Sequence, residues 1–389
     1  MLDLTNINML HDDAILLIID KINDYNDIIK FAAQNKRIRY LIINKVNDIY
    51  LKLRNNNSKL PKINNINWNQ FIKICHMIER AKYFVNNGGK INNIPVGKTF
   101  VNLTNNFINL NNKNLNNQDL ELLCSLLLYY GEHIIRIDLS NNNISEIEFL
   151  IYSLNKNIEF LILSNNKIKN LIPFMYTNKN IRNLKLLNLG NNYINDINPL
   201  IYILKNNKNF EYLYLANNKI TDITILAYAF KNNPKFKDLS LNLNKITDIS
   251  PLKNAFETNY EFNNLNLDNN IIDNIDVLSH AFKNNLKYLS LNNNKIININ
   301  PLINVFKNNL KLEWIGLGYN QINDISILKD SFQNNYKLEW LDLSTNKIIN
   351  IIPLINAFPN NINKLSIYIT NNPIQIKNQL EIKGISIRY

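Results

Sequence analysis

One pattern of apolar and polar positions repeats along most of the chain. A clear copy begins at Leu239, reads L-x-L-x-x-N-x-I-x-D-I-x-x-L-x-x-x-F, and starts again at Leu265. Its first apolar residue recurs in steps of 24 or 26 residues, at Ile137, Leu161, Leu187, Leu213, Leu239, Leu265, Leu289, Ile315, Leu341 and Ile367. A fixed period of this length is the signature of a solenoid, because one unit cannot bury its apolar face alone but a stack can.

The pattern predicts a short strand followed by a turn in each repeat. Two leucines separated by one residue alternate with period two, so both point inward from a strand. The asparagine follows where the chain turns away, at Asn142, Asn166, Asn192, Asn218, Asn244, Asn270, Asn294, Asn320, Asn346 and Asn372. Its amide donates and accepts, so we expect stacked asparagines to satisfy backbone groups as a ladder.

A short helix is predicted after the turn. Ile246, Ile249, Leu252 and Phe256 are spaced by three, three and four residues, which one helical face can present. Proline, tolerated at the first helical position, stands at the expected start in four repeats: Pro199, Pro251, Pro301 and Pro353. Asparagine pairs such as 232–233 and 284–285 end the helix, and a return loop leads to the next strand.

Over roughly residues 105–389 the frame resembles the leucine-rich-repeat family. The resemblance implies an α/β solenoid, a curved horseshoe of about ten to eleven repeats with parallel strands inside and short helices outside. The wording I-T-D-I-S-P-L at 246–252 is close to the internalins and the protein-phosphatase regulators, although the outer segment here is longer. An irregular first repeat, with Lys113 at the asparagine position, is expected at the start of the array.

Residues 1–54 do not follow the frame and predict a small all-α domain. Helices are expected over 10–22 and 27–38, with a turn at 23–26 between them and a third apolar segment over 39–53. Residues 55–64 form a polar linker, and capping helices, with Trp68 in their core, complete a segment over 55–104. The predicted domains are therefore 1–54, 55–104 and 105–389.

The opening resembles an F-box. The match lies in the acidic entry after Leu10, the apolar first helix, the second helix from Asp27 and a basic pair at 36–37, whereas His11 and Ile38 depart from the usual proline and tryptophan. The resemblance implies a helical domain that docks a Skp-type adaptor through apolar residues left free by the repeats, and the candidates are Leu10, Ile15, Ile19 and Ile28. The alternative is a plain helical cap, which would bury these residues against the first repeat.

Charge and cysteine content narrow the function classes. The net charge is +12, but the lysines are scattered along the chain. No stripe of arginines alternates with aromatic residues, so we do not expect nucleic-acid binding. Cys75 and Cys124 stand alone and predict buried thiols rather than a metal site or disulfide framework. No catalytic constellation, cofactor motif, signal peptide or membrane span is evident. We expect a monomeric, non-enzymatic protein of the cytoplasm or nucleus.

The variable positions of the strands predict a binding surface. Residues flanking the inward leucines must point away from the core, onto the inner, concave face. Large side chains gather there, and aromatic residues are the usual anchors of protein interfaces. The candidates are Phe160, Tyr212, Tyr214, Tyr288, Trp314, Trp340 and Tyr368. The alternative is that these rings only stack on each other along the sheet.

Three functions remain open from the sequence. The first is a substrate receptor of a Skp-cullin-F-box ubiquitin ligase, as the resemblance to F-box and leucine-rich-repeat proteins of eukaryotes and large DNA viruses implies. The second is a bare interaction scaffold whose N-terminal helices cap the array. The third is a regulatory subunit of an enzyme such as a phosphatase. The proteins captured from an extract would discriminate between them.

Overall fold

The structure of the protein is a computed structural model. It describes residues 15–16, 19–20, 22, 24–34, 36–56, 67–176, 181–283, 286–355, 357–359, 365–375 and 385–388. The chain forms two compact units, each described here by itself. The first comprises residues 1–137, 142–158 and 172–181, and the second comprises 138–141, 159–171 and 182–389. Leu10, His11 and most of the first expected helix lie outside the described residues.

The N-terminal part of the first unit is helical, as predicted. It contains α2 (Tyr25–Gln34), α3 (Lys36–Asn56) and α4 (Trp68–Asn86). The carboxylate of Asp24 accepts a hydrogen bond from the backbone N–H of Asn26 at 2.8 Å, so α2 begins inside the expected turn. The mixed apolar spacing of the third segment becomes the single long helix α3, and Trp68 is half-buried and stacks on Phe71 with ring centroids 5.6 Å apart.

A β-hairpin follows α4 where only capping helices were expected. Strands β1 (Ile94–Val96) and β2 (Thr99–Val101) pair antiparallel. The turn between them needs Gly97, whose φ is +58° and whose missing Cβ would come within 2.6 Å of Leu115 Cδ2. The rest of the first unit holds β3 (Phe107–Asn109), η2 (Gln118–Leu120), α5 (Glu121–Tyr130), α6 (Glu148–Ser153), η3 (Ile172–Tyr176) and part of β4 (Arg136–Asp138).

The repeats build one twelve-stranded sheet in chain order from β3 to β14. Strands β5 to β14 pair in parallel, with corresponding residues of successive repeats side by side. Their bounds are β5 (Phe160–Ile162), β6 (Leu186–Asn188), β7 (Tyr212–Tyr214), β8 (Asp238–Ser240), β9 (Asn264–Asn266), β10 (Tyr288–Ser290), β11 (Trp314–Gly316), β12 (Trp340–Asp342), β13 (Leu365–Tyr368) and β14 (Ile385–Arg388). The predicted solenoid with parallel strands is confirmed.

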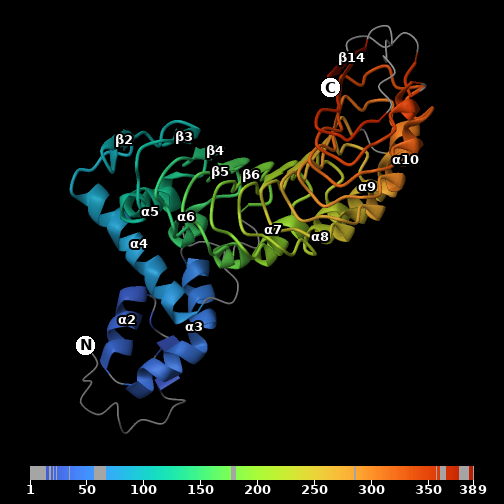
Figure 1. Cartoon of the computed structure of the whole chain (residues 1–389). Coiled ribbons are helices and arrows are strands. Elements are labelled where there is room, and N and C mark those ends of the chain that lie inside the picture. Colours follow the sequence, from blue (N-terminus) through green and yellow to red (C-terminus); the bar gives the residue numbers. More distant parts are fainter. Residues whose placement is uncertain are drawn as a thin grey trace. The chain divides into compact units, whose positions relative to one another are not determined.

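The outer segments are shorter than the apolar spacing indicated. Ile246 and Ile249 precede the helix, Leu252 lies in a 3-10 turn and Phe256 in an α-helix, yet all four are buried. Figure 1 shows α7, α8, α9 and α10 following one another along one side of the second unit. These segments are η4 (Asn198–Leu200), α7 (Ile201–Asn206), α8 (Leu226–Asn232), η5 (Ser250–Leu252), α9 (Lys253–Thr258), η6 (Asp276–Lys283), η7 (Asn300–Leu302), α10 (Ile303–Asn308), η8 (Ser326–Leu328) and η9 (Ile352–Leu354).

The predicted asparagine ladder is confirmed. In one rung, Asn244 Nδ2 donates to the carbonyl oxygens of Leu215 and Leu241, both at 3.0 Å. Asn244 Oδ1 accepts from the backbone N–H of Ile220 at 3.0 Å. Leu215 and Ile220 belong to the preceding repeat, so each amide ties two repeats together.

A second asparagine ladder lies in the return loops and was not predicted. Its members are almost fully buried, and most donate to a main-chain carbonyl of the preceding repeat: Asn207, Asn233, Asn259, Asn309 and Asn335. Asn259, for example, donates to Phe236 O at 2.6 Å and accepts from Glu261 N–H at 2.9 Å. The asparagine pairs therefore do more than end the helix, since their second member fixes the return to the next strand.

Candidate protein-binding surface

The exposed sheet face consists of the residue before the first leucine and the residue between the two leucines of each repeat. Because strand residues alternate, both positions point away from the buried leucines. On this face the structure brings together four of the seven predicted residues, here called the aromatic row: Tyr288, Trp314, Trp340 and Tyr368. The parallel register places Tyr288 beside Trp314 and Trp314 beside Trp340.

The rings of the aromatic row form a continuous stack. The centroid distances are 5.7 Å from Tyr288 to Trp314, 4.3 Å from Trp314 to Trp340 and 4.1 Å from Trp340 to Tyr368. Arg388 from β14 extends the stack, with its Cζ 5.1 Å from the Tyr368 ring centroid. We expected the two tryptophans to be neighbours, which is confirmed, and substantially exposed, which is wrong: both are half-buried because each covers a face of the other.

A shallow pocket of about 560 Å³ opens over the aromatic row, between Asn264 on one side and Ser366 on the other. The indole Nε1 atoms of Trp314 and Trp340 are buried and have no hydrogen-bond partner. Because these two donors have almost no accessible surface, the pocket presents ring edges rather than indole N–H groups to a ligand.

The other three predicted residues lie elsewhere on the same face. Phe160 is on β5, and Tyr212 and Tyr214 are on β7, all half-buried. Polar side chains on β8 and β9 separate them from the aromatic row. There, Asp238 Oδ2 accepts from Asn264 Nδ2 at 3.0 Å and from the Tyr214 hydroxyl at 3.4 Å. Burial raises the pKa of Asp238 despite these hydrogen bonds, which act to lower it.

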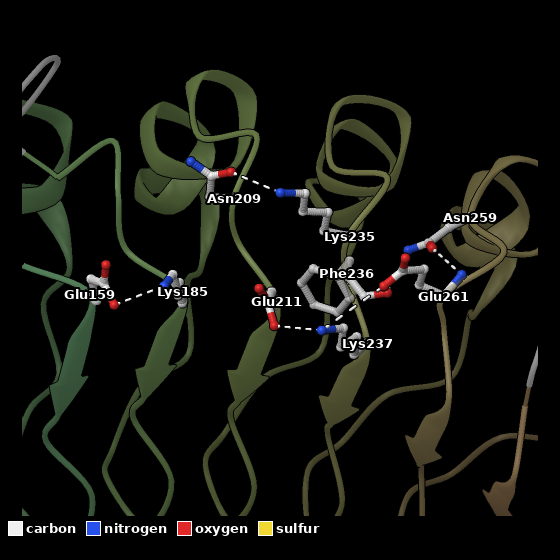
Figure 2. A network of polar contacts seen from close by, with 9 residues as sticks. All are labelled: Glu159, Lys185, Asn209, Glu211, Lys235, Phe236, Lys237, Asn259 and Glu261. Carbon is white, nitrogen blue, oxygen red and sulfur yellow. Dashed lines mark hydrogen bonds and ion pairs between the residues drawn. The ribbon is translucent and has the colours of Figure 1, made fainter.

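A row of mostly charged residues borders the exposed sheet face, one residue before the strands β5 to β12, and only Asn263 in this row is uncharged. Glu159 Oε2 pairs with Lys185 Nζ at 2.8 Å, and Glu211 Oε2 pairs with Lys237 Nζ at the same distance (Figure 2). Lys287 pairs with Glu313 at 3.4 Å. Such exposed pairs contribute little to stability individually. This charged row was missed from the sequence, although Glu and Lys alternate from Glu159 to Lys237 at a fixed distance from the leucines.

Among the described residues, Glu339 has no ion-pair partner. It occupies the position of the charged row beside Trp340 and is exposed. The next repeat places the buried Leu365 at the equivalent position, so the charged row ends there. The exposed carboxylate of Glu339 lies at the edge of the pocket.

Carboxylates also lie on the opposite side of the aromatic row. Asp268 Oδ1 accepts from Ser290 Oγ and from the backbone N–H of Asn292, both at 2.6 Å. Burial raises the pKa of Asp268, against the effect of these hydrogen bonds. Asp342 stands next to Gly318, where a Cβ would come within 2.8 Å of its carboxylate oxygens. Glycine at this position leaves room for the Asp342 side chain.

The predicted adaptor-binding residues do not form a surface. Ile15, Ile19 and Ile28 are buried in the hydrophobic core formed with α2, α3 and α4, so the expectation that they remain exposed is wrong; Leu10 lies outside the described residues. Their burial follows from the helices packing on one another. Instead, α3 exposes three other apolar side chains at helical spacing: Tyr40 (65% exposed), Ile43 (40%) and Leu51 (36%).

Within the described part of the chain, no group of three or more His, Cys, Asp or Glu side chains could hold a metal ion. Cys75 and Cys124 are buried free thiols, and burial raises the pKa of Cys124 to about 12. Such thiols are poor nucleophiles because little thiolate is present. In the same described residues, no helix combines the length and apolar character needed to cross a bilayer.

A family model described as leucine-rich repeats (2 copies) matches residues 208–254. The array is a leucine-rich-repeat solenoid. The same repeat frame and the same ladder continue on both sides of the matched residues, so the chain is a leucine-rich-repeat protein with an N-terminal helical region. The match does not extend into residues 1–54, and the F-box resemblance therefore rests on the sequence pattern alone.

One solved structure shows the same leucine-rich-repeat fold. A chain from the octameric complex of latrophilin 3, Unc5D and FLRT2 aligns with a TM-score of 0.51 and 19% identity, covering 74% of this chain and 84% of that one. An internalin from Listeria monocytogenes aligns with a TM-score of 0.48 and 22% identity, covering 74% and 88%. No curated protein sequence matches the chain.

Proposed function

We propose that this leucine-rich-repeat protein binds a protein partner on the exposed sheet face, over β10 to β13. The observation that carries the proposal is the aromatic row. The solenoid does not need rings at these positions, because the equivalent places in other repeats hold Asp238, Asn264 and Ser366. Half-buried aromatic side chains around a shallow pocket are typical anchors of protein interfaces. The similar chain noted above belongs to a multiprotein complex, which agrees with this role.

The test is to capture partners with the full chain and compare a double variant, Trp314→Ala with Trp340→Ala. Each anchor is expected to contribute about 2 kcal/mol or more, which is about thirtyfold in affinity. The matched control is Tyr336→Ala, which removes an aromatic ring that is 62% exposed on a return loop. Circular dichroism verifies the fold of each variant. Unchanged binding by the folded double variant would place the interface elsewhere.

A second candidate function is a substrate receptor of a Skp-cullin-F-box ubiquitin ligase, acting in the cytoplasm or nucleus. The observation that favours it is an apolar stripe on α3, formed by Tyr40, Ile43 and Leu51. No described part of the chain covers these three side chains. Together with the F-box-like sequence, this stripe would replace the buried isoleucines as the adaptor-docking surface. The exposed sheet face would then hold the protein to be ubiquitinated.

This second role is tested with a purified Skp-type adaptor. Tyr40→Ser combined with Ile43→Ser should abolish adaptor binding, whereas Tyr83→Ser, which removes a tyrosine 72% exposed on α4, should leave binding intact. If the intact chain does not bind the adaptor, the ligase role is rejected. Capture of a phosphatase instead would indicate a regulatory subunit, and capture of neither would indicate a scaffold.

A further inference from the structure

The electrostatics of the pocket differ from those of the whole chain. The protein carries a net charge of +12. Around the aromatic row, however, Glu313 and Glu339 line the pocket, and Asp268 and Asp342 lie on the other side of the row. Two basic side chains stand against these four carboxylates: Lys287 in the pocket and Arg388, which stacks on Tyr368. The one lysine lining the pocket, Lys287, is already paired with Glu313. A local excess of negative charge on a basic protein selects for a cationic ligand.

One end of the aromatic stack already binds a guanidinium. Arg388 lies over Tyr368 with its Cζ 5.1 Å from the ring centroid. A planar guanidinium stacks on an aromatic face through cation–π attraction and dispersion, and it can simultaneously donate two parallel hydrogen bonds to a carboxylate. The chain therefore shows which chemical group suits the terminal face of this stack.

The opposite end of the stack is open. Tyr288 stacks on Trp314 through one face, and its other face is turned towards β9, where the register places Asn264. No ring or cation of the described residues stacks on that second face. Asn264 is shorter than an aromatic side chain and is held down by its hydrogen bond to Asp238. The result is a slot with the ring of Tyr288 as its wall, the amide of Asn264 as its floor and the carboxylate of Asp238 at its far side.

We propose that the pocket binds a basic segment of the protein partner, with an arginine guanidinium stacked on the free face of Tyr288 above Asn264. The segment would cross the strands along the aromatic row, and a second cationic side chain would pair with Glu339. The aliphatic stems of these side chains would cover the ring edges. This inference rests on the proposed function, since it names the chemistry of the partner held at the same surface.

The first experiment measures binding of short synthetic peptides to the full chain. The chain has three tryptophans, so Trp68→Phe leaves only Trp314 and Trp340 to report by fluorescence. A peptide of alternating arginine and serine should change the emission saturably. The lysine counterpart should bind about fivefold or more weaker, because an ammonium lacks the planar stack. The glutamate counterpart should not bind. Equal binding of the arginine and lysine peptides, or no binding of either, would overturn the assignment.

Two substitutions test the slot and the carboxylate separately. Asn264→Tyr should continue the aromatic row and occupy the free face of Tyr288, and it should lower arginine-peptide affinity about tenfold or more. Glu339→Lys should lower it about tenfold and reduce its salt dependence. Glu146→Lys, an exposed carboxylate outside the pocket, is the matched control and should have no effect. Asn264→Tyr is expected to fold, because rings already occupy the equivalent position in other repeats. Circular dichroism verifies the fold of each variant.

The captured natural partner separates the two levels of the proposal. If binding survives loss of both tryptophans, the proposed function fails. If binding requires the tryptophans but is unchanged by Asn264→Tyr and Glu339→Lys, the surface is an interface but its partner is not basic, and only the inference fails. Loss of partner binding in all three variants, with the Glu146→Lys control unaffected, supports both.

Discussion

The frame asparagine illustrates how a single side chain fixes the fold. Asn244 is buried and its amide makes hydrogen bonds to Leu215, Leu241 and Ile220, whereas its neighbour Asn242 is half-buried and accepts a hydrogen bond from Ser240 Oγ. Asn244→Ala should lower the free energy of unfolding by about 2–3 kcal/mol, since it leaves buried backbone groups unpaired. Asn242→Ala should cost less than about 1 kcal/mol. Equal shifts in chemical denaturation would contradict the ladder.

Strain at one backbone position can be relieved. The residue before each ladder asparagine has positive φ, and it is asparagine in most repeats but Leu243 (φ +58°) in one. A left-handed conformation costs a non-glycine residue about 1–2 kcal/mol, and asparagine tolerates it better than leucine. Leu243→Asn should therefore stabilise the protein by about 1 kcal/mol in chemical denaturation. Leu310→Asn, at an exposed position without positive φ, should change stability by less than about 0.5 kcal/mol.

The buried carboxylate of Asp238 should make stability depend on pH. Because its pKa is raised in the folded state, the folded protein binds more protons than the unfolded chain between the unfolded pKa of about 4 and the raised value. Its contribution is complete below the unfolded pKa and is lost as pH rises through the folded pKa. The stability of the natural chain relative to Asp238→Asn should therefore increase on acidification from pH 7 to 4. A constant difference in unfolding free energy between the two chains across this range would contradict the raised pKa of Asp238. The contribution of Asp268 cancels in this comparison because both chains contain it.

At the scale of elements, the strands, their parallel pairing and the asparagine ladder were predicted, whereas the outer segments and the β1–β2 hairpin were not. The strands follow from the alternation of leucines, and the ladder follows from a polar residue that must be buried at a turn. The outer segment was misjudged because Ile246 and Ile249 are buried by stacking of repeats rather than by a helical face. Apolar spacing reports burial but cannot distinguish these two causes.

The β1–β2 hairpin provides a prediction for an element. Gly97→Ala combines a strained positive φ with a clash against Leu115, and should cost about 2 kcal/mol or more of unfolding free energy. Gly88→Ala has a similar φ of +82° but no atom within 4 Å of the added Cβ, and should cost only the backbone strain of about 1 kcal/mol. Equal costs in urea titrations would mean that Leu115 moves aside freely.

For the candidate site, the sequence predicted which residues lie on the exposed sheet face but not how their side chains contact one another. The four rings of the aromatic row lie on the exposed sheet face, as predicted, because their positions on the strand point them away from the buried leucines. Their stacking was stated from the sequence only as the alternative to a binding surface, and the structure shows it. The half-burial that results was not predicted, because it depends on ring contacts between repeats. The isoleucines at 15, 19 and 28 were recognised as apolar, but a sequence does not specify whether a partner or the other helices cover them.

For the whole molecule, the two compact units should respond differently to truncation. The helices before residue 57 share a hydrophobic core with Phe71, Ile78 and Tyr152 of the same unit. Deleting residues 1–56 should expose these side chains and destabilise the first unit, while the repeats from β6 onward retain protection in hydrogen exchange. Loss of protection throughout the array would instead make the helical region an obligatory cap. Retained protection in both units would mean that the shared core is dispensable.

The ladder also determines how such a chain can change length in evolution. Ladder amides such as Asn244 bond to their own repeat and to the one before it, and corresponding residues recur after 24 or 26 positions. Removing or duplicating one complete period therefore restores every hydrogen bond at the junction, whereas a partial deletion leaves unmatched rungs. Gains and losses of whole repeats are therefore the permitted changes. Between β8 and β9 they would change the number of strands with polar side chains beside the aromatic row without altering the row itself.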